Sequence, residues 1–128
     1  MDFPVTVDAC VFIEYFRSKN KENTLLAKLN RQRRKFFVSA VAKYEVLAGA
    51  KEEHLSEWRQ IFEDITVIAF DDSTIATARL VCQQLKKENK MIDLGDILIA
   101  ATAMANGLPL ATLNCNHFER VRGLELVG

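Results

Sequence analysis

The sequence has no long hydrophobic run, few cysteines and no excess of either charge. No apolar stretch reaches the ~18 residues of a membrane-spanning helix, so we expect no membrane partner. Residues 1–4 have neither the basic start nor the apolar core of a secretion signal. The 3 cysteines are an odd number without zinc-type spacing, which favours reduced thiols in the cytoplasm. These absences argue against a membrane protein, a secreted disulfide scaffold and a zinc module.

The composition is that of one globular domain, which we expect to span residues 1–128. Hydrophobic residues make up 49% and charged residues 27% of the chain. Lys plus Arg and Asp plus Glu are each 17, so net charge favours no partner. The distribution is uneven, because residues 23–44 contain cations and no acid. Within that stretch, four residues are candidates for guiding RNA, or else form a solvated helix end that meets the helix dipole: Arg31, Arg33, Arg34 and Lys35.

Strand-like and helix-like segments alternate along the chain. Short β-rich runs occur at residues 4–7, 35–39, 65–70 and 110–112, with a further candidate at 124–126. Helical patterns fill the intervals, at residues 10–16, from 24, at 40–50 and 52–62, from 71, and at 96–106. This alternation predicts an α/β/α sandwich with a central, mostly parallel sheet of four or five strands.

Four polar residues fall where an open parallel sheet collects ligands, beyond the carboxyl ends of its strands. Asp8 follows the first strand, Asn114 follows the fourth, Asp96 begins a helix, and Glu45 lies within an apolar helix. Local explanations exist, because both aspartates suit N-cap positions. The glutamate lies either on a narrow solvated stripe or in a polar pocket. If the side chains converge, a hard divalent cation would relieve their repulsion, activate water and hold a scissile phosphate.

Smaller candidates near this edge each leave two interpretations open. Asp93 either adds a ligand or has a loop or capping role. Thr112 either hydrogen-bonds the carboxylates or ends a strand, and Ser39 either orients Glu45 or caps its helix. Cys10 and Cys115 lie near the site in sequence, but nothing in the sequence lowers their pKa, so we interpret them as packing residues.

Four segments carry a resemblance to a known family. They are VDACVFI at 7–13, SAVAKYEVLAG at 39–49, DILIAA at 96–101, and TLNCNHFERV at 112–121 followed by Gly123 and Leu124. Each is short and weak alone. In this order, and over essentially the whole chain, they resemble the PIN-domain ribonucleases, particularly the VapC-type toxins of bacterial toxin–antitoxin pairs.

The resemblance implies a Rossmann-like PIN domain with Asp8, Glu45 and Asp96 as metal-binding acids and Asn114 as a fourth polar position. It also implies an endoribonuclease that depends on Mg²⁺ or Mn²⁺ and inhibits translation. Members are commonly homodimers and are held inactive by a cognate VapB-type antitoxin. The sequence therefore predicts a catalytic site built from these four residues.

Two departures from the family pattern keep an alternative open. Ala9 and Cys10 replace the usual Thr-Asn, and His117 stands where the family often has an acid. A PIN module that binds RNA or an antitoxin without cleaving is therefore the alternative. An aspartyl-phosphate phosphatase would require a second aspartate at the position of Cys10, which a thiol does not replace.

Overall fold

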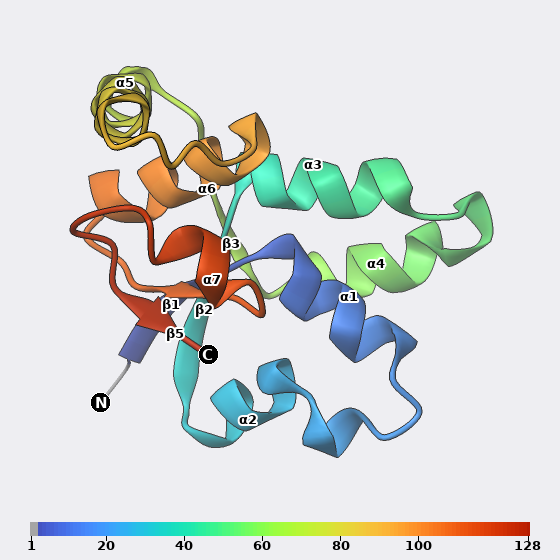
Figure 1. Ribbon diagram of the computed structural model, residues 1–128. Coiled ribbons are helices and arrows are strands. Elements are labelled where there is room, and N and C mark those ends of the chain that lie inside the picture. The colour runs from blue at the N-terminus through green and yellow to red at the C-terminus, as the bar shows by residue number, and fades with distance from the viewer. Residues whose placement is uncertain (1–2) are drawn as a thin grey trace.

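The computed structural model describes residues 3–128, which form a five-stranded parallel sheet flanked by helices (Figure 1). The strand order is β3-β2-β1-β4-β5, and every neighbouring pair is parallel. The strands are β1 (Phe3–Val7), β2 (Arg34–Ser39), β3 (Thr66–Ile68), β4 (Leu110–Ala111) and β5 (Leu126–Val127). The prediction of an α/β/α sandwich with a parallel sheet is confirmed.

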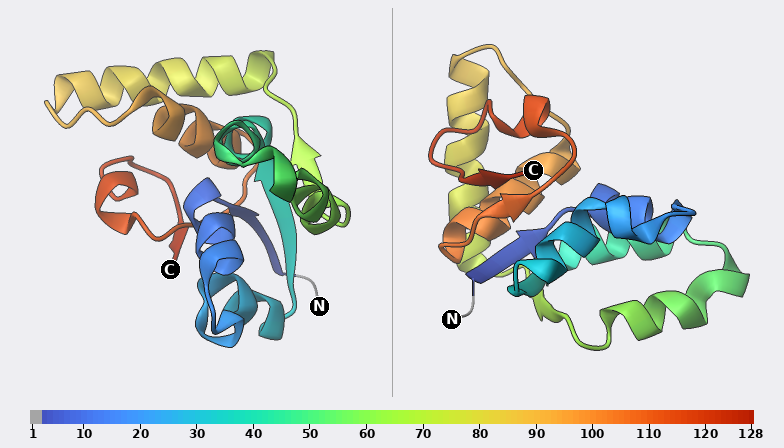
Figure 2. Two further views of the ribbon diagram at one scale, coloured as in Figure 1. Left: turned by 90° about the vertical axis from the view of Figure 1, so that its right-hand side faces the viewer. Right: turned by 90° about the horizontal axis from the view of Figure 1, so that it is seen from below.

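Two groups of helices cover the two faces of the sheet (Figures 1 and 2). One face carries α1 (Ala9–Arg17), α2 (Leu25–Arg31), α3 (Ala40–Gly49) and α4 (Leu55–Phe62), together with the 3₁₀ turns η1 (Lys21–Asn23) and η2 (Glu52–His54). The other face carries α5 (Asp72–Lys87) and α6 (Leu94–Ala105). The chain moves outward from β1 to β3 and then returns to β4. Right-handed crossovers in opposite directions place the two groups of helices on opposite faces.

The core lies around the central strand β1. Val5 and Val7 are fully buried, as are Phe12 of α1, Val38 of β2 and Leu110 of β4. Burial on both faces explains why β1 is an apolar run rather than an alternating one. The Ser39 hydroxyl accepts a hydrogen bond from the Ala42 N–H at 3.0 Å, so the capping interpretation of Ser39 is the one that the structure adopts.

Several boundaries differ from the predicted ones because they depend on neighbouring segments. The third strand ends at Ile68 rather than at residue 70, and the fifth lies at Leu126–Val127 rather than at 124–126. The helix predicted at 52–62 is interrupted, since η2 precedes α4. The short helix α7 (Cys115–Phe118) was not predicted. Within residues 3–128, no helix combines the length and the apolar character needed to cross a membrane.

Candidate active site

Asp8 is fixed at the carboxyl end of the central strand. Its side chain is almost wholly buried, with the residue 4% exposed. One carboxylate oxygen, Oδ1, accepts the Ala9 N–H at 2.8 Å, which makes Asp8 the N-cap of α1. The other, Oδ2, accepts the Thr112 hydroxyl at 2.8 Å across 104 positions of sequence. The capping of α1 and the hydrogen bond from Thr112 therefore occur together.

Thr112 also positions the loop after β4. Its Oγ1 accepts the backbone N–H of Asn114 at 3.0 Å while its hydroxyl donates to Asp8. Asn114 precedes α7, is exposed, and makes no side-chain capping bond. The backbone of Asn114 is thus held next to Thr112, and its side chain is exposed.

Cys10 has a polar role that the sequence analysis missed. Its thiol donates to Asp8 Oδ2 at 3.3 Å, and its sulfur accepts the Leu113 N–H at 3.4 Å. It also lies 3.7 Å from Thr112 Oγ1. Burial, followed by the negative charge of Asp8, raises the pKa of Cys10 to about 11, so the thiol stays protonated and keeps donating at neutral pH. The interpretation of Cys10 as a packing residue was therefore incomplete, and only its position two residues after Asp8 could have signalled this.

The charge of Asp8 acts on two further carboxylates, those of Glu45 and Asp96. Partial burial, then the charges of Asp8 and Asp96, raises the pKa of Glu45 on α3. Partial burial, then the charges of Asp8 and Asp93, raises the pKa of Asp96 on α6, while His117 opposes the rise. Glu45 is exposed, as expected for a solvated stripe, but its carboxylate also lies within the electrostatic influence of Asp8 and Asp96. Such mutual repulsion is what a bound cation would relieve.

Helices α3 and α6 approach closely at this point because α6 has a glycine there. A Cβ added to Gly95 would lie 2.7 Å from Glu45 Oε2, well inside van der Waals contact. The missing side chain leaves room for the glutamate carboxylate directly beside Asp96. Gly95 therefore shapes the site, although it carries no functional group.

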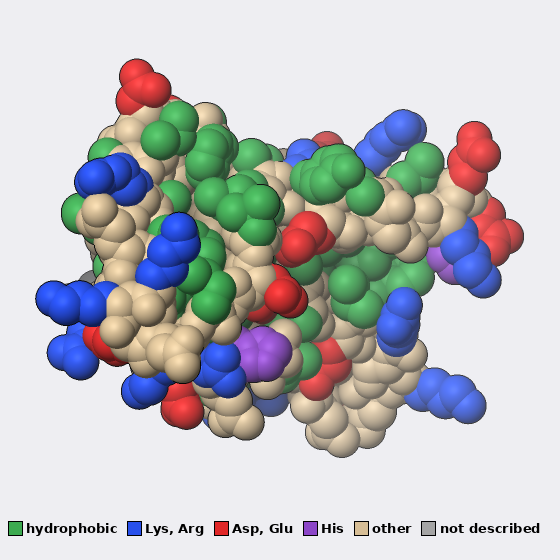
Figure 3. All heavy atoms as spheres, turned by 45° about the horizontal axis from the view of Figure 1, so that its top comes forward, with side chains coloured by type: hydrophobic (Ala, Val, Ile, Leu, Met, Phe, Trp, Pro, Cys, Tyr) green, Lys and Arg blue, Asp and Glu red, His purple; other side chains and the backbone are tan. Residues whose placement is uncertain are grey.

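Asp96 is not the N-cap that the sequence suggested. Helix α6 begins at Leu94, so Asp93 takes the cap position by its backbone without a side-chain capping bond, and Asp96 lies in the first turn. The Asp93 carbonyl accepts the Ile97 N–H at 3.0 Å, which starts the helix earlier than predicted. His117 Nδ1 lies 3.8 Å from Asp96 Oδ2, so α7 also borders the site. Figure 3 shows acidic side chains beside a histidine in the middle of one face, with hydrophobic side chains around them.

The oxygen donors suit a hydrated hard cation better than an enclosed one. Within residues 3–128, no group of three or more His, Cys, Asp or Glu side chains is arranged to hold a metal ion by itself, so a cation here would need water or substrate ligands as well. Mg²⁺ usually keeps several waters and is bound through one or two carboxylates together with substrate phosphates. The charge of Asp8 acting on Glu45 and Asp96, and the place that Gly95 leaves for the Glu45 carboxylate, fit such an ion.

The predicted RNA-guiding residues lie away from the carboxylates. Arg31 ends α2, and Arg34 and Lys35 begin β2, whose other end is Ser39. Because the strands are parallel, the start of β2 is at the amino edge of the sheet, roughly 16 Å from the carboxyl edge at about 3.3 Å per residue. Arg31 also donates to the Glu22 carbonyl at 2.9 Å. This placement favours the solvated helix end over a role at the site.

The fold and the carboxylate edge define a class of protein. The chain belongs to the PIN-domain family, whose sequence model matches residues 5–124. Ribonuclease VapC1 of Methanocaldococcus jannaschii is 30% identical over 123 residues, covering 95% of this chain and 84% of that protein. The tRNA(fMet)-specific endonuclease VapC of Shigella flexneri is 26% identical, covering 98% of this chain and 96% of that protein. The resemblance stated from the four segments is confirmed.

Solved structures share the same fold. DNA-bound VapBC from Salmonella typhimurium matches with a TM-score of 0.85 and 20% identity, over 98% of this chain and 97% of that one. VapBC-1 from nontypeable Haemophilus influenzae matches with a TM-score of 0.84 and 19% identity, over 98% and 97% of the two chains. At these identities the likeness concerns the fold alone.

Proposed function

We propose that this chain is a metal-dependent endoribonuclease of the VapC type, acting in the cytoplasm as the toxin of a toxin–antitoxin pair. The observation that supports the proposal is electrostatic: the negative charge of Asp8, at the carboxyl edge of the sheet, contributes to raising the pKa values of both Glu45 and Asp96. Relatives named ribonuclease or endonuclease that align over nearly the whole chain support it.

Each residue has a distinct task in the proposed reaction. Asp8, Glu45 and Asp96 would hold Mg²⁺ or Mn²⁺, which when bound supplies positive charge for the scissile phosphate and lowers the pKa of a water. Thr112 keeps Asp8 Oδ2 in one direction through its 2.8 Å hydrogen bond. Asn114, with its exposed amide, orients the water or the phosphate. Asp93 is too exposed to be fixed in the site and contributes negative charge beside Asp96.

Cleavage of RNA should require a divalent cation. We expect the pure protein to cut RNA with Mg²⁺ or Mn²⁺ and to lose that activity in chelator, because the acids alone repel the phosphate. Gel analysis of structured RNAs with and without metal measures this. Full activity in chelator would rule out the metal mechanism. Binding without cleavage under every metal condition would favour the binding-only PIN module.

Replacing Cys10 should separate its hydrogen bonds from its packing. Cys10→Ser keeps a donor and an acceptor, and we expect its kcat to stay within a few-fold of wild type. Cys10→Ala removes the donor to Asp8 and should lower kcat by roughly 10–100-fold, the usual effect of losing a residue that orients a metal ligand. The KM should change little. Cys82→Ala on α5, also half-buried, is the matched control. Equal kcat values for Cys10→Ala and Cys82→Ala would mean that Cys10 contributes only packing.

Adding a methyl group at Gly95 should improve the helix and harm the site. Gly95→Ala is expected to gain up to about 1 kcal/mol of folding stability from helix propensity. It should lower the cleavage rate, because the new Cβ displaces the Glu45 carboxylate from a position 2.7 Å away. The control is the Glu45→Ala background, in which the same change has no carboxylate to displace. Equal rate losses in both backgrounds would contradict this role of Gly95.

We further propose a VapB-type antitoxin and a second copy of this chain as partners. The neighbours in fold include VapBC complexes, and a reading frame adjacent to this gene would identify the antitoxin. Dimerisation is supported by an exposed apolar surface beside Glu45. Tyr44 and Leu94 are each 70% exposed there, and Phe70 is 40% exposed. Sedimentation of the pure protein would measure its mass in solution.

A further inference from the structure

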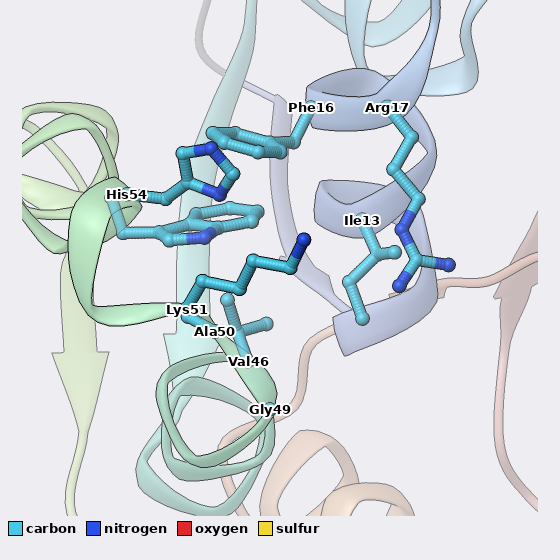
Figure 4. A pocket seen from close by; sticks show the side chains of 9 residues that line it. Ile13, Phe16, Arg17, Val46, Gly49, Ala50, Lys51 and His54 are labelled. Atoms are coloured by element: carbon cyan, nitrogen blue, oxygen red, sulfur yellow. The ribbon is translucent and has the colours of Figure 1, made fainter.

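A pocket lies beside α1, between the end of α3 and the start of α4 (Figure 4). Its volume is about 330 Å³. One wall is aromatic: Phe16 stacks on Trp58 with ring centroids 4.5 Å apart, and His54 meets Phe16 edge to face at 5.1 Å. Trp58 is buried, so this stack ties α1 firmly to α4. The pocket is therefore part of the rigid framework.

Two cationic side chains reach into this pocket. Arg17 is the last residue of α1, and Lys51 follows α3. Figure 4 shows the charged ends of Lys51 and Arg17 on either side of the Ile13 side chain, and both residues line the pocket. Within the described part of the chain, neither forms an ion pair or donates a side-chain hydrogen bond. Two like charges that face one space repel each other, and an anion placed between them removes that repulsion.

The position of each cation also has a local explanation. Arg17 and Lys51 both lie at carboxyl ends of helices, where the helix dipole favours positive charge. That effect accounts for each residue separately. It does not account for their convergence in one concave space with an aromatic wall. The two explanations differ in whether removing the charges changes the binding of a ligand.

We propose that this pocket binds a backbone phosphate of the same RNA strand, a few nucleotides away from the phosphate at the carboxylates, an inference that rests on the proposed function. Helix α1 begins beside Asp8, and α3 carries Glu45, so the same two helices lead from the acids to the cations. The path is roughly 9–14 Å at about 1.5 Å per residue, a span that a few nucleotides cover.

The charge distribution favours RNA as the occupant. An RNA strand is repelled by three carboxylates, and a chain with net charge +0 offers no general attraction to offset this. Cations next to the acids supply the missing attraction locally. Proteins that bind single strands combine such cations with aromatic side chains, as Arg17 and Lys51 are combined here with Phe16.

The test measures RNA binding without cleavage. Binding of a labelled single-stranded RNA to the full-length Asp96→Asn protein is followed by fluorescence anisotropy in chelator across a salt titration. Adding Arg17→Gln and Lys51→Gln should raise Kd about tenfold and reduce the slope of log affinity against log salt by about 0.7 for each cation removed. The matched control is Lys86→Gln with Lys87→Gln at the exposed end of α5, which removes the same charge from the other face and should change neither quantity.

Further variants distinguish the remaining outcomes. Arg17→Lys with Lys51→Arg keeps both charges and should keep the salt slope, which guards against a folding defect in the glutamine pair. If the double variant Arg17→Gln, Lys51→Gln folds but its Kd and its salt slope are unchanged, the two cations only stabilise helix ends. That result would overturn the proposal. If the double glutamine variant loses affinity for a poly-glutamate peptide but not for RNA, the occupant of the pocket is an acidic protein and the proposal is overturned. Weaker binding only after replacing Arg31, Arg33 and Arg34 by glutamine would also overturn it.

Cleavage kinetics separate this inference from the proposed function. In the otherwise wild-type protein with Mg²⁺, the glutamine pair should raise KM with kcat within about twofold, because the lost contact binds substrate and transition state equally. A protein that binds RNA through Arg17 and Lys51 but cleaves none with any metal would contradict the proposed function and leave the phosphate pocket standing.

Discussion

The Asp96→Asn protein is expected to fold normally and to cleave RNA at least about 100-fold more slowly than wild type. Removing a residue that merely orients a metal ligand costs 10–100-fold, and Asp96 is proposed as a ligand itself. Asparagine keeps the shape of the side chain and removes its charge. Because Asp96 lies within the first turn of α6 and does not cap it, no capping bond is lost.

Stability should not fall in this variant. Asp96 carries a pKa raised by burial and by its acidic neighbours, so removing its charge also removes repulsion. Cleavage rates and thermal unfolding are the two measurements. Asp72→Asn makes the same change in the first turn of α5, at an exposed position, and should cleave like wild type. Wild-type activity in Asp96→Asn would exclude Asp96 from the chemistry.

Magnesium should stabilise the wild-type protein and have much less effect once an acid of the site is removed. Linkage gives about 2.7 kcal/mol when the ion is present at 100 times its Kd, which corresponds to a rise in Tm of several degrees for a domain of this size. Thermal unfolding of wild type, Asp8→Ala, Glu45→Ala and Asp96→Ala across a magnesium titration measures this. Glu57→Ala, an exposed acid of α4, should respond as wild type does.

In chelator the three alanine variants should differ from one another. Glu45→Ala loses repulsion and no hydrogen bond, so we expect it to be as stable as wild type or more stable. Asp96→Ala also loses repulsion, which should offset the loss of its 3.8 Å contact with the exposed His117. Asp8→Ala loses the bonds from Ala9 and Thr112 and leaves a buried hydroxyl without its acceptor. It should cost roughly 1–3 kcal/mol, partly offset by the lost repulsion. If magnesium raised the Tm of wild type, Asp8→Ala, Glu45→Ala and Asp96→Ala by the same amount, a shared metal site would be excluded.

The pH dependence of the metal-free protein has a definite sign. The pKa values of Glu45 and Asp96 are raised in the folded state, so between the ordinary carboxyl range and the raised values the folded state binds more protons than the unfolded state. Their contribution to stability therefore falls as the pH rises through that window. Bound magnesium displaces those protons and should flatten the dependence. Unfolding in chelator at a series of pH values measures it.

Patterns read along the chain were sufficient for the layers of the fold and for the edge on which the acids lie. The alternation of β-rich and helical runs requires parallel strands, and parallel strands place Asp8 and Thr112 at one edge together. The N-cap at Ser39 also follows from a short local pattern, since its bond to Ala42 spans only three residues. These features depend on hydrogen bonds and periodicities within a few residues, which a single sequence displays directly.

Contacts between distant residues were decided only by the tertiary structure. The bond from Thr112 to Asp8 and the contacts of Cys10 with the loop after β4 join residues more than 100 positions apart, and they depend on the register of β4 against β1. The start of α6 at Leu94 removed Asp96 from its predicted cap. The sequence by itself determined the family and the sheet, and it supplied the acids that we propose for the site, because these follow from local pattern and order. Which side chains orient those acids, and which cations lie near them, was set by how strands and helices pack, because side-chain contacts depend on distances that the order of residues does not contain.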